Sequence, residues 1–411
     1  MVQQTRPVRP RVVIVGAGFA GLNAMQELGR GDAQVTLVDR NPYTTFQPLL
    51  YQVATGALSA GDVAFPLRVS ASRYRNVRVR VGGMTALRAA ERQVELDDGS
   101  TLDYDYLVLA TGVTTNWARI PGAEANSMPI YSLDDAIRMR EELLRCLEDT
   151  AAGRRRASHV VVIGGGATGV EMAGTMAELR RRWIPLTYPE LAPKQTSVTL
   201  VERFDHVLSP YRPRLRAKAA RALRRRGVRM LLGSTVASVE HDTVVLADGT
   251  RLPSDVTVWA LGVAAPQQIG GYGLRQGKGG AIVVTRALNV EEHPEIFVAG
   301  DLASPPDPLP QLAQPGIQMG RHAARQILAA AQGRPLTPFV YHDLGTMATV
   351  GRCEAVLQFD NGFGLSGLPA WVGWIAVHVA QLLGGRNRLT VLINFLWRYF
   401  GPRRSAASVA K

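Results

Sequence analysis

The sequence is short of cysteine. Its 411 residues include only Cys146 and Cys353, and no two cysteines stand in a CxxC pair. A small scaffold held by disulfides is therefore excluded, and so is a zinc site built on paired cysteines. We expect a chain that buries a sizeable apolar core of its own and works in a reducing compartment.

Lysine and acidic residues are also scarce. Lys+Arg number 47 against 34 Asp+Glu, a net charge of +13, and only four of the basic residues are lysines. This balance suits a polyanion, either nucleic acid or an anionic lipid surface. No aromatic side chains interleave with the arginine runs, so we do not expect nucleic-acid binding. Hydrophobic residues at 46% exclude a disordered chain and leave contact with a membrane open.

A long hydrophobic run is missing as well. No charged residue lies between Asp360 and Arg386, but Pro369 and several glycines limit the apolar helix to residues 368–383. That helix is shorter than the roughly twenty residues that span a bilayer. A second amphipathic segment covers residues 389–400. We expect two tilted helices at a membrane interface, and the alternatives are a single span or a pair of dimer-interface helices.

These two segments carry the residues expected to touch the membrane. The aromatic anchors would be Trp371, Trp374, Trp397 and Tyr399, beside an apolar face of Leu389, Leu392, Ile393, Leu396 and Phe400. Headgroups would meet Asn394, Arg398, Arg403 and Arg404, with Arg386 and Arg388 nearby. The basic N-terminus leads into a strand with no cleavage site after it, so we do not expect export. The protein is expected at the cytoplasmic face of the cell inner membrane.

Glycine is abundant, so a glycine motif is meaningful only where a predicted strand precedes it and a predicted helix follows it. The pattern GxGxxG occurs three times, whereas 41 glycines in 411 residues predict about 0.4 matches by chance. Only two matches follow an apolar strand and open a helix. The third, over residues 362–367, is followed by Pro369 and has no carboxylate about twenty residues later, so we interpret it as loop.

The first match has every part of a dinucleotide-binding βαβ unit. A strand over 12–15 leads into it, a helix over 22–28 follows, and a second strand over 34–38 ends at Asp39. The helix N-terminus would hold a pyrophosphate, and Asp39, 18 residues after the last glycine, would accept ribose hydroxyls. The glycines of this first loop are Gly16, Gly18 and Gly21.

The second match repeats the design with a longer spacing. A strand over 159–163, a helix over 170–182 and a strand over 197–201 lead to Glu202, 33 residues after the last glycine. We interpret the inserted residues 183–195 as an extended loop. Glu202 would repel a 2′-phosphate, which favours NADH, while the adjacent Arg203 leaves NADPH as the alternative. The glycines of this second loop are Gly164, Gly166 and Gly169.

Two dinucleotide sites in one chain suggest an electron relay, in which a resident flavin takes a hydride from a visiting nicotinamide. Residues 107–112 resemble the strand and ATG turn that close the first domain of two-dinucleotide flavoproteins, and 296–301 resemble the second flavin motif of that family. The resemblance implies that FAD occupies the first site and the nicotinamide the second. The additional FAD-binding residues would be Thr111, Gly112, Gly300 and Asp301.

The electron acceptor is indicated by a further resemblance. Residues 40–60 contain no cysteine, so the redox cysteine pair of dithiol reductases is missing there. Segments 46–56, 164–171, 311–320 and 344–351 closely resemble the type II NADH:quinone dehydrogenases, over essentially the whole chain. The resemblance implies NADH oxidation through FAD with electrons passed to a membrane quinone, no proton pumping and no metal.

The same resemblance implies the architecture. We expect an α/β fold with two Rossmann-like dinucleotide-binding domains, similar to glutathione reductase, plus a C-terminal helical membrane-anchoring segment. The FAD domain is expected to be discontinuous. The predicted ranges are 1–154 and 289–345 for the FAD domain, 155–288 for the NADH domain and 346–411 for the membrane-association region.

The catalytic residues expected from the resemblance are Glu171, Gln314 and Gln318. The family motif AQxAxQxG opens a helix that points at the flavin and places Gln314 and Gln318 at the flavin and quinone; Gly316 stands where the family has alanine, which puts the pocket shape in doubt. The alternative is an ordinary helix with two solvated glutamines. Glu171 would lie beside the nicotinamide and flavin, or would simply favour a helix N-terminus. Only residue type suggests His322 and His342 as proton donors.

The alternative function is a soluble NAD(P)H-dependent flavoprotein reductase that delivers electrons to a small acidic carrier protein. Arginine runs at 154–156, 180–182 and 224–226 would dock such a carrier. The preferred partners are a quinone and an anionic membrane surface, and a homodimer is left open.

Overall fold

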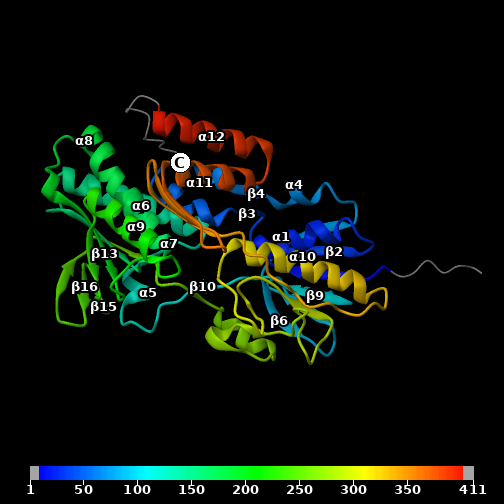
Figure 1. The fold of residues 1–411 in the computed structure, drawn as a ribbon. Coiled ribbons are helices and arrows are strands. Elements are labelled where there is room, and N and C mark those ends of the chain that lie inside the picture. The colour runs from blue at the N-terminus through cyan, green and yellow to red at the C-terminus, as the bar shows by residue number, and fades with distance from the viewer. Residues whose placement is uncertain (1–8, 401–411) are drawn as a thin grey trace, which may run out of the picture. The chain divides into compact units, whose positions relative to one another are not determined.

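The computed structural model describes residues 9–400, and side chains as far as residue 397 (Figure 1). The chain forms two compact units, each assembled from separate stretches of sequence. Unit 1 contains the described residues up to 44 together with 65–114 and 263–343. Unit 2 contains 45–64, 115–262 and the described residues from 344 onward. Segments 45–64 and 115–154 thus pack with unit 2 and 263–288 with unit 1.

Unit 1 is built on a five-stranded parallel sheet. Its strands are nearly continuous apolar runs, as expected where both faces of a sheet are covered. Helix α1 (Phe19–Leu28) joins the first two strands, and the long helix α10 (Ala313–Ala330) packs on α1. In order across the sheet the strands are β21 (Ile296–Val298), β9 (Tyr106–Leu109), β1 (Arg11–Val15), β2 (Gln34–Asp39) and β5 (Val77–Val81).

Smaller elements complete unit 1. An antiparallel sheet contains β6 (Met84–Arg88), β7 (Gln93–Leu96) and β8 (Thr101–Asp103). Unit 1 also contains helix α4 (Leu67–Ala71) and the paired strands β20 (Ile282–Val283) and β22 (Ala303–Ser304). Two 3-10 turns, Gln267–Tyr272 and Lys278–Gly280, belong to it as well. Four short strands lie where the chain passes between units: β3 (Tyr43–Thr45), β4 (Ala64–Pro66), β10 (Thr114–Thr115) and β19 (Val263–Ala264).

Unit 2 repeats the parallel five-stranded design and confirms the second βαβ element. Its sheet contains β11 (Met128–Pro129), β18 (Val256–Trp259), β12 (Ser158–Ile163), β13 (Thr196–Glu202) and β14 (Arg229–Leu232), in that order. Its main helices are α6 (Leu133–Ala151), α7 (Ala167–Glu178) and α9 (Pro213–Arg225). Two antiparallel sheets accompany them: β15 (Val236–Val239), β16 (Thr243–Leu246) and β17 (Arg251–Pro253), and β23 (Thr346–Gly351), β24 (Glu354–Gln358) and β25 (Gly364–Gly367). The short helices are α2 (Leu50–Ala54), α3 (Ala60–Val63) and α5 (Ala123–Asn126), with a 3-10 turn over Gln47–Leu49.

The insertion in unit 2 is not the extended loop that the sequence suggested. A π-helical turn, Leu179–Trp183, continues α7, and helix α8 (Ile184–Thr187) and a 3-10 turn (Pro193–Gln195) follow. Ile184 and Tyr188 are buried against Leu147 of α6, and this apolar contact keeps the insertion folded. The third glycine match lies in the hairpin formed by β24 and β25, so it is no dinucleotide loop.

Two helices end the described chain, α11 (Leu368–Gln381) and α12 (Gly385–Phe400). Among residues 9–400, none of the helices has both the length and the apolar character that a membrane crossing requires. The expectation that Trp371 and Trp374 anchor the protein in a membrane is wrong, because both side chains are buried. Asn394 does not reach outward either, since its amide donates to Asp62 Oδ2 at 3.1 Å. The side chains of Arg398, Tyr399 and Phe400, and residues Arg403 and Arg404, lie outside the described part.

Candidate functional site

The first glycine loop, residues 16–21, is shaped by contacts that only glycine permits. Gly16 has φ +100°, and a Cβ on it would lie 2.2 Å from the carbonyl oxygen of Ala110. A Cβ on Gly21 would lie 1.8 Å from the oxygen of Gly16, so the loop and α1 meet backbone to backbone. A Cβ on Gly18 would meet nothing within 4 Å. This open side, at the uncapped N-terminus of α1, fits a pyrophosphate.

Asp39, at the carboxyl end of β2, holds the first loop in place. Its Oδ2 accepts from the Ala17 amide at 2.7 Å and its Oδ1 accepts from the Asn41 amide at 2.8 Å. Burial raises the pKa of Asp39, and the two backbone donors oppose that rise. The carboxylate therefore lies at the end of the strand, where the dinucleotide fold places the acid that meets the ribose.

Two more polar groups follow neighbouring strands of the same sheet. Thr111 comes after β9, and its Oγ1 is buried without a hydrogen-bond partner in the described part of the chain. Asp301 comes after β21, and burial raises its pKa to about 6. Because carboxyl ends of parallel strands share one edge, both groups lie along the edge that carries the first loop. An unsatisfied hydroxyl and a buried carboxyl fit the hydroxyl-rich chain of FAD.

Helix α10 crosses α1 beside this edge. A Cβ on Gly320 would lie 2.1 Å from the Ala20 carbonyl oxygen, so the two backbones touch. A Cβ on Gly316 would find ordinary contacts, the nearest being Phe19 Cβ at 3.7 Å. The residue that departs from the family pattern therefore lies where alanine fits. The first turn of α10 has no side-chain cap and no acidic residue, and it contains the half-buried Gln314.

Gln318 is not a solvated glutamine. Its Nε2 donates to the His342 carbonyl at 2.9 Å, and its Oε1 accepts from the His342 amide at 3.0 Å. Gln326, two turns later, binds Thr337 in the same two-point manner. His322 lies between them with Nε2 3.1 Å from the Thr337 carbonyl, and burial lowers its pKa. Gln318 thus positions the segment that contains His342, a role that residue type alone did not reveal.

The second glycine loop, residues 164–169, has the same geometry. Gly164 has φ +109°, and its Cβ would lie 2.4 Å from the Ala260 carbonyl oxygen. A Cβ on Gly169 would lie 1.9 Å from the oxygen of Gly164, and one on Gly166 would meet nothing within 4 Å. This loop, too, opens at an uncapped helix N-terminus.

Glu202 holds the second loop as Asp39 holds the first. Its Oε2 accepts from the Gly165 amide at 2.5 Å, and its Oε1 accepts from the Phe204 amide at 2.9 Å. The guanidinium carbon of Arg203 lies 4.6 Å from the centre of the Phe204 ring, a cation–π contact. The acid is thus fixed at the end of β13, and the adjacent arginine stacks on its neighbour.

Glu171 is the fifth residue of α7, beyond the first turn, so a favourable helix terminus does not explain it. Its Oε1 accepts from the Thr349 amide at 3.2 Å, and burial raises its pKa to about 8. Burial raises the pKa of Tyr211, and the charge of Glu171 adds to that rise; the Tyr211 hydroxyl lies 3.1 Å from Thr346 Oγ1. Sequence reasoning missed Tyr211, whose turn carries no motif, whereas 344–351 was already marked as a characteristic segment.

The predicted residues therefore form two groups. Unit 1 contains the first loop, Asp39, Thr111, Gly112, Gly300, Asp301, Gln314 and Gln318. Unit 2 contains the second loop, Glu202 and Glu171.

Comparisons with known proteins give the family and the fold of the chain. Residues 10–320 match the family model described as pyridine nucleotide-disulphide oxidoreductase. The chain is 35% identical to the type II NADH:quinone oxidoreductase NdhA of Mycobacterium tuberculosis, over 98% of this chain and 89% of the relative. It is 34% identical to the type II NADH:quinone oxidoreductase Ndh of the same organism, over 98% and 91%. The structure of NDH2 from Plasmodium falciparum in complex with NADH has the same fold, with a TM-score of 0.88, 18% identity and coverage of 96% and 99%.

Proposed function

The chain belongs to the pyridine nucleotide-disulphide oxidoreductase family and, within it, to the type II NADH:quinone oxidoreductases, and from this premise we propose that it passes electrons from NADH through bound FAD to a quinone. One observation carries the proposal. A single chain contains two complete dinucleotide loops, each fixed by an acid at the end of the next strand. Residues 40–60 offer no cysteine for dithiol chemistry, so the electrons leave toward a different acceptor.

FAD, when bound, supplies the two-electron chemistry that links a hydride donor to a quinone. In unit 1 the first loop would hold its pyrophosphate and Asp39 a ribose. Thr111 and Asp301 would bond its remaining hydroxyls, and Gly112 and Gly300, both with positive φ, shape the turns that carry them. Gln314, in the first turn of α10, would face the flavin and quinone, and Gln318 would hold the neighbouring segment in place.

In unit 2 the second loop would bind the coenzyme. Glu202 would accept its ribose hydroxyls, and its negative charge disfavours the 2′-phosphate of NADPH. Because the Glu171 pKa is about 8, this side chain carries a proton at neutral pH. We propose that Glu171 holds that proton at its carboxyl group and supplies it as the quinone is reduced.

The test is anaerobic. Purified enzyme is reduced with NADH while flavin absorbance is followed, and then a short-chain quinone is added. Bleaching followed by stoichiometric reoxidation is expected. Failure of the quinone to reoxidise the flavin, with reoxidation by an acidic electron-carrier protein instead, would overturn the proposal.

The arginine runs do not favour the carrier-protein alternative, because several of their members are used inside the fold. Arg155 pairs with Asp255 at 2.5 Å, Arg180 donates to the Thr196 carbonyl at 2.7 Å, and Arg226 donates to the Arg352 carbonyl at 3.0 Å. Such arginines stabilise unit 2 and are not spare charges for docking.

We propose further that the protein binds the anionic cytoplasmic face of the inner membrane through α11 and α12. Asn387 and Asn394 hold the inner side of α12 on the α3 segment, through the carbonyls of residues 61, 62 and 64 and the carboxylate of Asp62. The opposite side exposes apolar residues spaced as one helix face. These membrane-face residues are Leu389, Leu392, Ile393, Leu396 and Trp397.

Vesicle sedimentation tests this surface without deleting buried residues. The double variant Ile393→Asp and Leu396→Asp should lose binding to phosphatidylglycerol vesicles, whereas Val69→Asp, an exposed apolar position in unit 1, should retain it. If the double variant still sediments and wild type is dimeric by light scattering, the face is an interface between copies and the membrane proposal fails.

A further inference from the structure

A cavity of about 390 Å³ lies in unit 2. Its floor is the sheet, with Val160, Val198 and Val256, and one wall is α6, with Leu144 and Leu147. The opposite wall is the inserted π-helical turn and α8. Ligand pockets commonly enclose roughly 300–1,000 Å³ with mainly apolar lining, so the cavity has the size and character of a small-molecule site.

The cavity is separate from the second glycine loop. It is lined by Ser158, His159 and Val160 at the amino end of β12, whereas the loop follows Ile163 at the carboxyl end. Met176, which also lines it, stands seven residues, or about 10 Å, along α7 from Gly169. Nucleotides bind at carboxyl ends of parallel strands, so the coenzyme does not account for this space.

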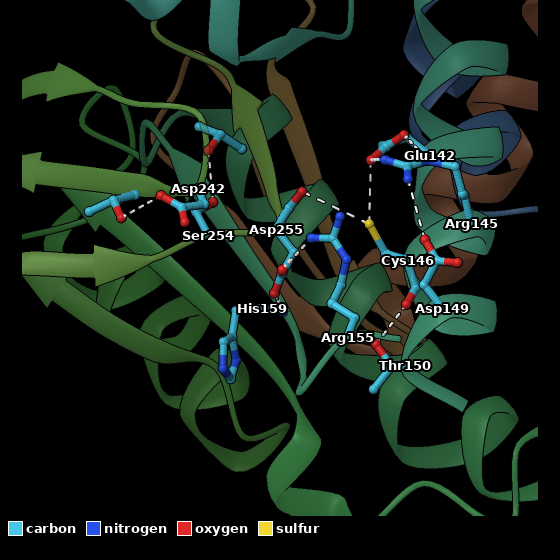
Figure 2. Close-up of polar contacts among 12 residues, drawn as sticks. Glu142, Arg145, Cys146, Asp149, Thr150, Arg155, His159, Asp242, Ser254 and Asp255 are labelled. Carbon is cyan, nitrogen blue, oxygen red and sulfur yellow. Dashed lines mark hydrogen bonds and ion pairs between the residues drawn. The ribbon is translucent and has the colours of Figure 1, made fainter. Parts of the chain in front are cut away.

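Helix α6 shows two different sides. Residues 140, 143, 144, 147 and 148 line the cavity. The other side is fixed by polar contacts that Figure 2 shows: the Arg145 guanidinium reaches Glu142 and Asp149, and the Cys146 thiol lies 3.4 Å from Glu142 Oε1. Across from it, Asp255 accepts from the backbone amide of His159 at 2.7 Å. The Cys146 thiol also donates to the Asp255 carbonyl at 3.9 Å, which links α6 to the segment before β18, so the cavity wall is supported from behind.

The insertion gives the cavity its other wall. Trp183 and Tyr188 line the cavity and contact each other edge to face, with ring centres 5.8 Å apart. Leu179 and Ile184 add apolar surface. A π-helical turn is rare and recurs at functional sites. The insertion that lengthens the spacing before Glu202 thus forms one wall of a mainly apolar pocket.

The polar groups at the cavity define what the ligand carries. Glu148 Oε1 accepts from the Tyr188 hydroxyl at 2.8 Å, and a carboxylate accepts further hydrogen bonds. Its charge would repel an anion, while Arg140 and Arg180, also lining the cavity, would repel a cation. His159 Nδ1 already lies 2.7 Å from Ser197 Oγ. Glu148 thus offers a hydrogen-bond acceptor beside a mainly apolar lining.

We propose that this cavity binds a neutral, mostly apolar small molecule that carries one hydrogen-bond donor directed at Glu148. The lining is mainly apolar, so such a molecule gains by burying its own apolar surface against it. The ligand touches the C-terminal end of α7 and, through Ala54, Thr55 and Gly56, the end of α2.

The probe is N-phenyl-1-naphthylamine, a neutral aromatic amine with one N–H that fluoresces in apolar surroundings. It is titrated into the flavin-loaded full-length protein. Leu144→Trp should fill the cavity and weaken probe binding at least about tenfold. Leu186→Trp is the matched control, because Leu186 is exposed on α8 and does not line the cavity. It should leave probe affinity unchanged.

Two further measurements keep the test decisive. Saturating NADH or menadione should not displace the probe, and 1-phenylnaphthalene, which lacks the N–H, should bind more weakly than N-phenyl-1-naphthylamine. Leu143→Phe replaces Leu144→Trp if the latter loses its flavin. Equal probe affinity in the filled and control variants, or displacement by menadione, would overturn the proposal, since the probe would then occupy another surface or the quinone site.

Discussion

The two glycine loops of this protein share the same close contacts between the loop backbone and the helix that follows it. In both, the third residue of the helix is a glycine whose Cβ would strike the carbonyl that opens the loop, at 1.8 Å for Gly21 and 1.9 Å for Gly169. In both, the acid after the second strand accepts from the amide of the residue after the loop's first glycine. The nucleotide scaffold is therefore duplicated in detail.

The units differ in what crosses the helix. In unit 1 helix α10 crosses α1, with Gly320 against the Ala20 carbonyl. In unit 2 strand β23 crosses α7, and a Cβ on Gly174 would lie 2.3 Å from the Val350 carbonyl. The fifth helix residue differs accordingly: Asn23 accepts from Arg321 of α10, and Glu171 accepts from the amide of Thr349. The common scaffold holds dinucleotides, and the crossing element decides which side chain faces the chemistry.

The largest expected effect comes from breaking the shared helix glycine. Gly21→Ala should yield protein without flavin, because the added methyl forces the first loop away from α1, and overpacking of this kind costs about 1–3 kcal/mol or more. Gly169→Ala should retain flavin absorbance but lose reduction by NADH. Stopped-flow bleaching of the flavin measures both.

Gly18→Ala and Gly166→Ala serve as controls, since a Cβ at either site meets nothing within 4 Å of protein. Compared without nucleotide, both variants should keep wild-type thermal stability and lose nucleotide affinity alone. Flavin loss in Gly169→Ala would contradict the separation of roles.

Glu171→Gln sharpens the contrast at the fifth helix position. We expect kcat to fall at least about tenfold with flavin content unchanged, because the amide cannot supply a proton. Wild-type kcat should decline as pH rises through about 8, the pKa of Glu171, and the variant profile should be flat there. Asn23→Ala, at the matching position of unit 1, should leave the pH profile unaltered.

The same carboxyl group gives stability a pH dependence. Its folded pKa of about 8 exceeds the value of an unfolded glutamate, so the folded state binds the extra proton. The stabilisation is complete below the unfolded pKa and is lost as pH rises through about 8. The Tm of wild type should therefore fall more than the Tm of Glu171→Gln as the pH rises to about 8. Plots of Tm against pH that run parallel for the two proteins would exclude a buried proton on Glu171.

Glu202→Ala tests whether the two acids serve different nucleotides. Loss of a hydrogen bond to a charged group costs about 1.5–3 kcal/mol, so KM for NADH should rise about tenfold or more. KM for NADPH should rise less, because the repulsion of the 2′-phosphate is removed as well. Asp39→Ala should instead release FAD, which ultrafiltration measures. Equal loss of both coenzymes in Glu202→Ala would remove Glu202 from the discrimination.

The smallest effects distinguish the helix crossings from their surroundings. Gly320→Ala and Gly174→Ala should each lower the free energy of unfolding by about 1–3 kcal/mol, since each added methyl meets a backbone carbonyl of the element packed against it. Gly316→Ala should be neutral or stabilising by up to about 1 kcal/mol, because alanine suits a helix and space is present. Denaturant unfolding measures all three. If Gly316→Ala lowers the free energy of unfolding, the space beside Gly316 is too small for a methyl group.

Much of the fold was accessible from sequence because it rests on local rules. Apolar runs of β-branched residues predict buried strands, and each strand, glycine loop, helix and acid of both βαβ units appears where the spacing indicated. Cysteine content excluded dithiol chemistry in the same direct way. The similarity to type II NADH:quinone oxidoreductases likewise depends on contiguous motifs, which need no structure to be seen.

The contacts and the burial of individual side chains could be seen only in the tertiary structure. Composition made Trp371 and Trp374 look like membrane anchors, yet long-range packing buries both, with Trp374 6.3 Å ring to ring from Tyr51. Asn394 and the insertion before Glu202 were misjudged for the same reason, and the contacts of Gln318 could not be foreseen. Their partners are far away in sequence: Asp62, Leu147 and His342 respectively.

The sequence by itself thus determined the two nucleotide scaffolds and their order, since those depend on residues within one βαβ unit. Only the tertiary structure decided which glutamine is engaged, which carboxyl is buried enough to hold a proton, and which pocket the insertion forms. Hydrogen bonding, desolvation and cavity formation depend on residues brought together from distant segments, and no local pattern records them.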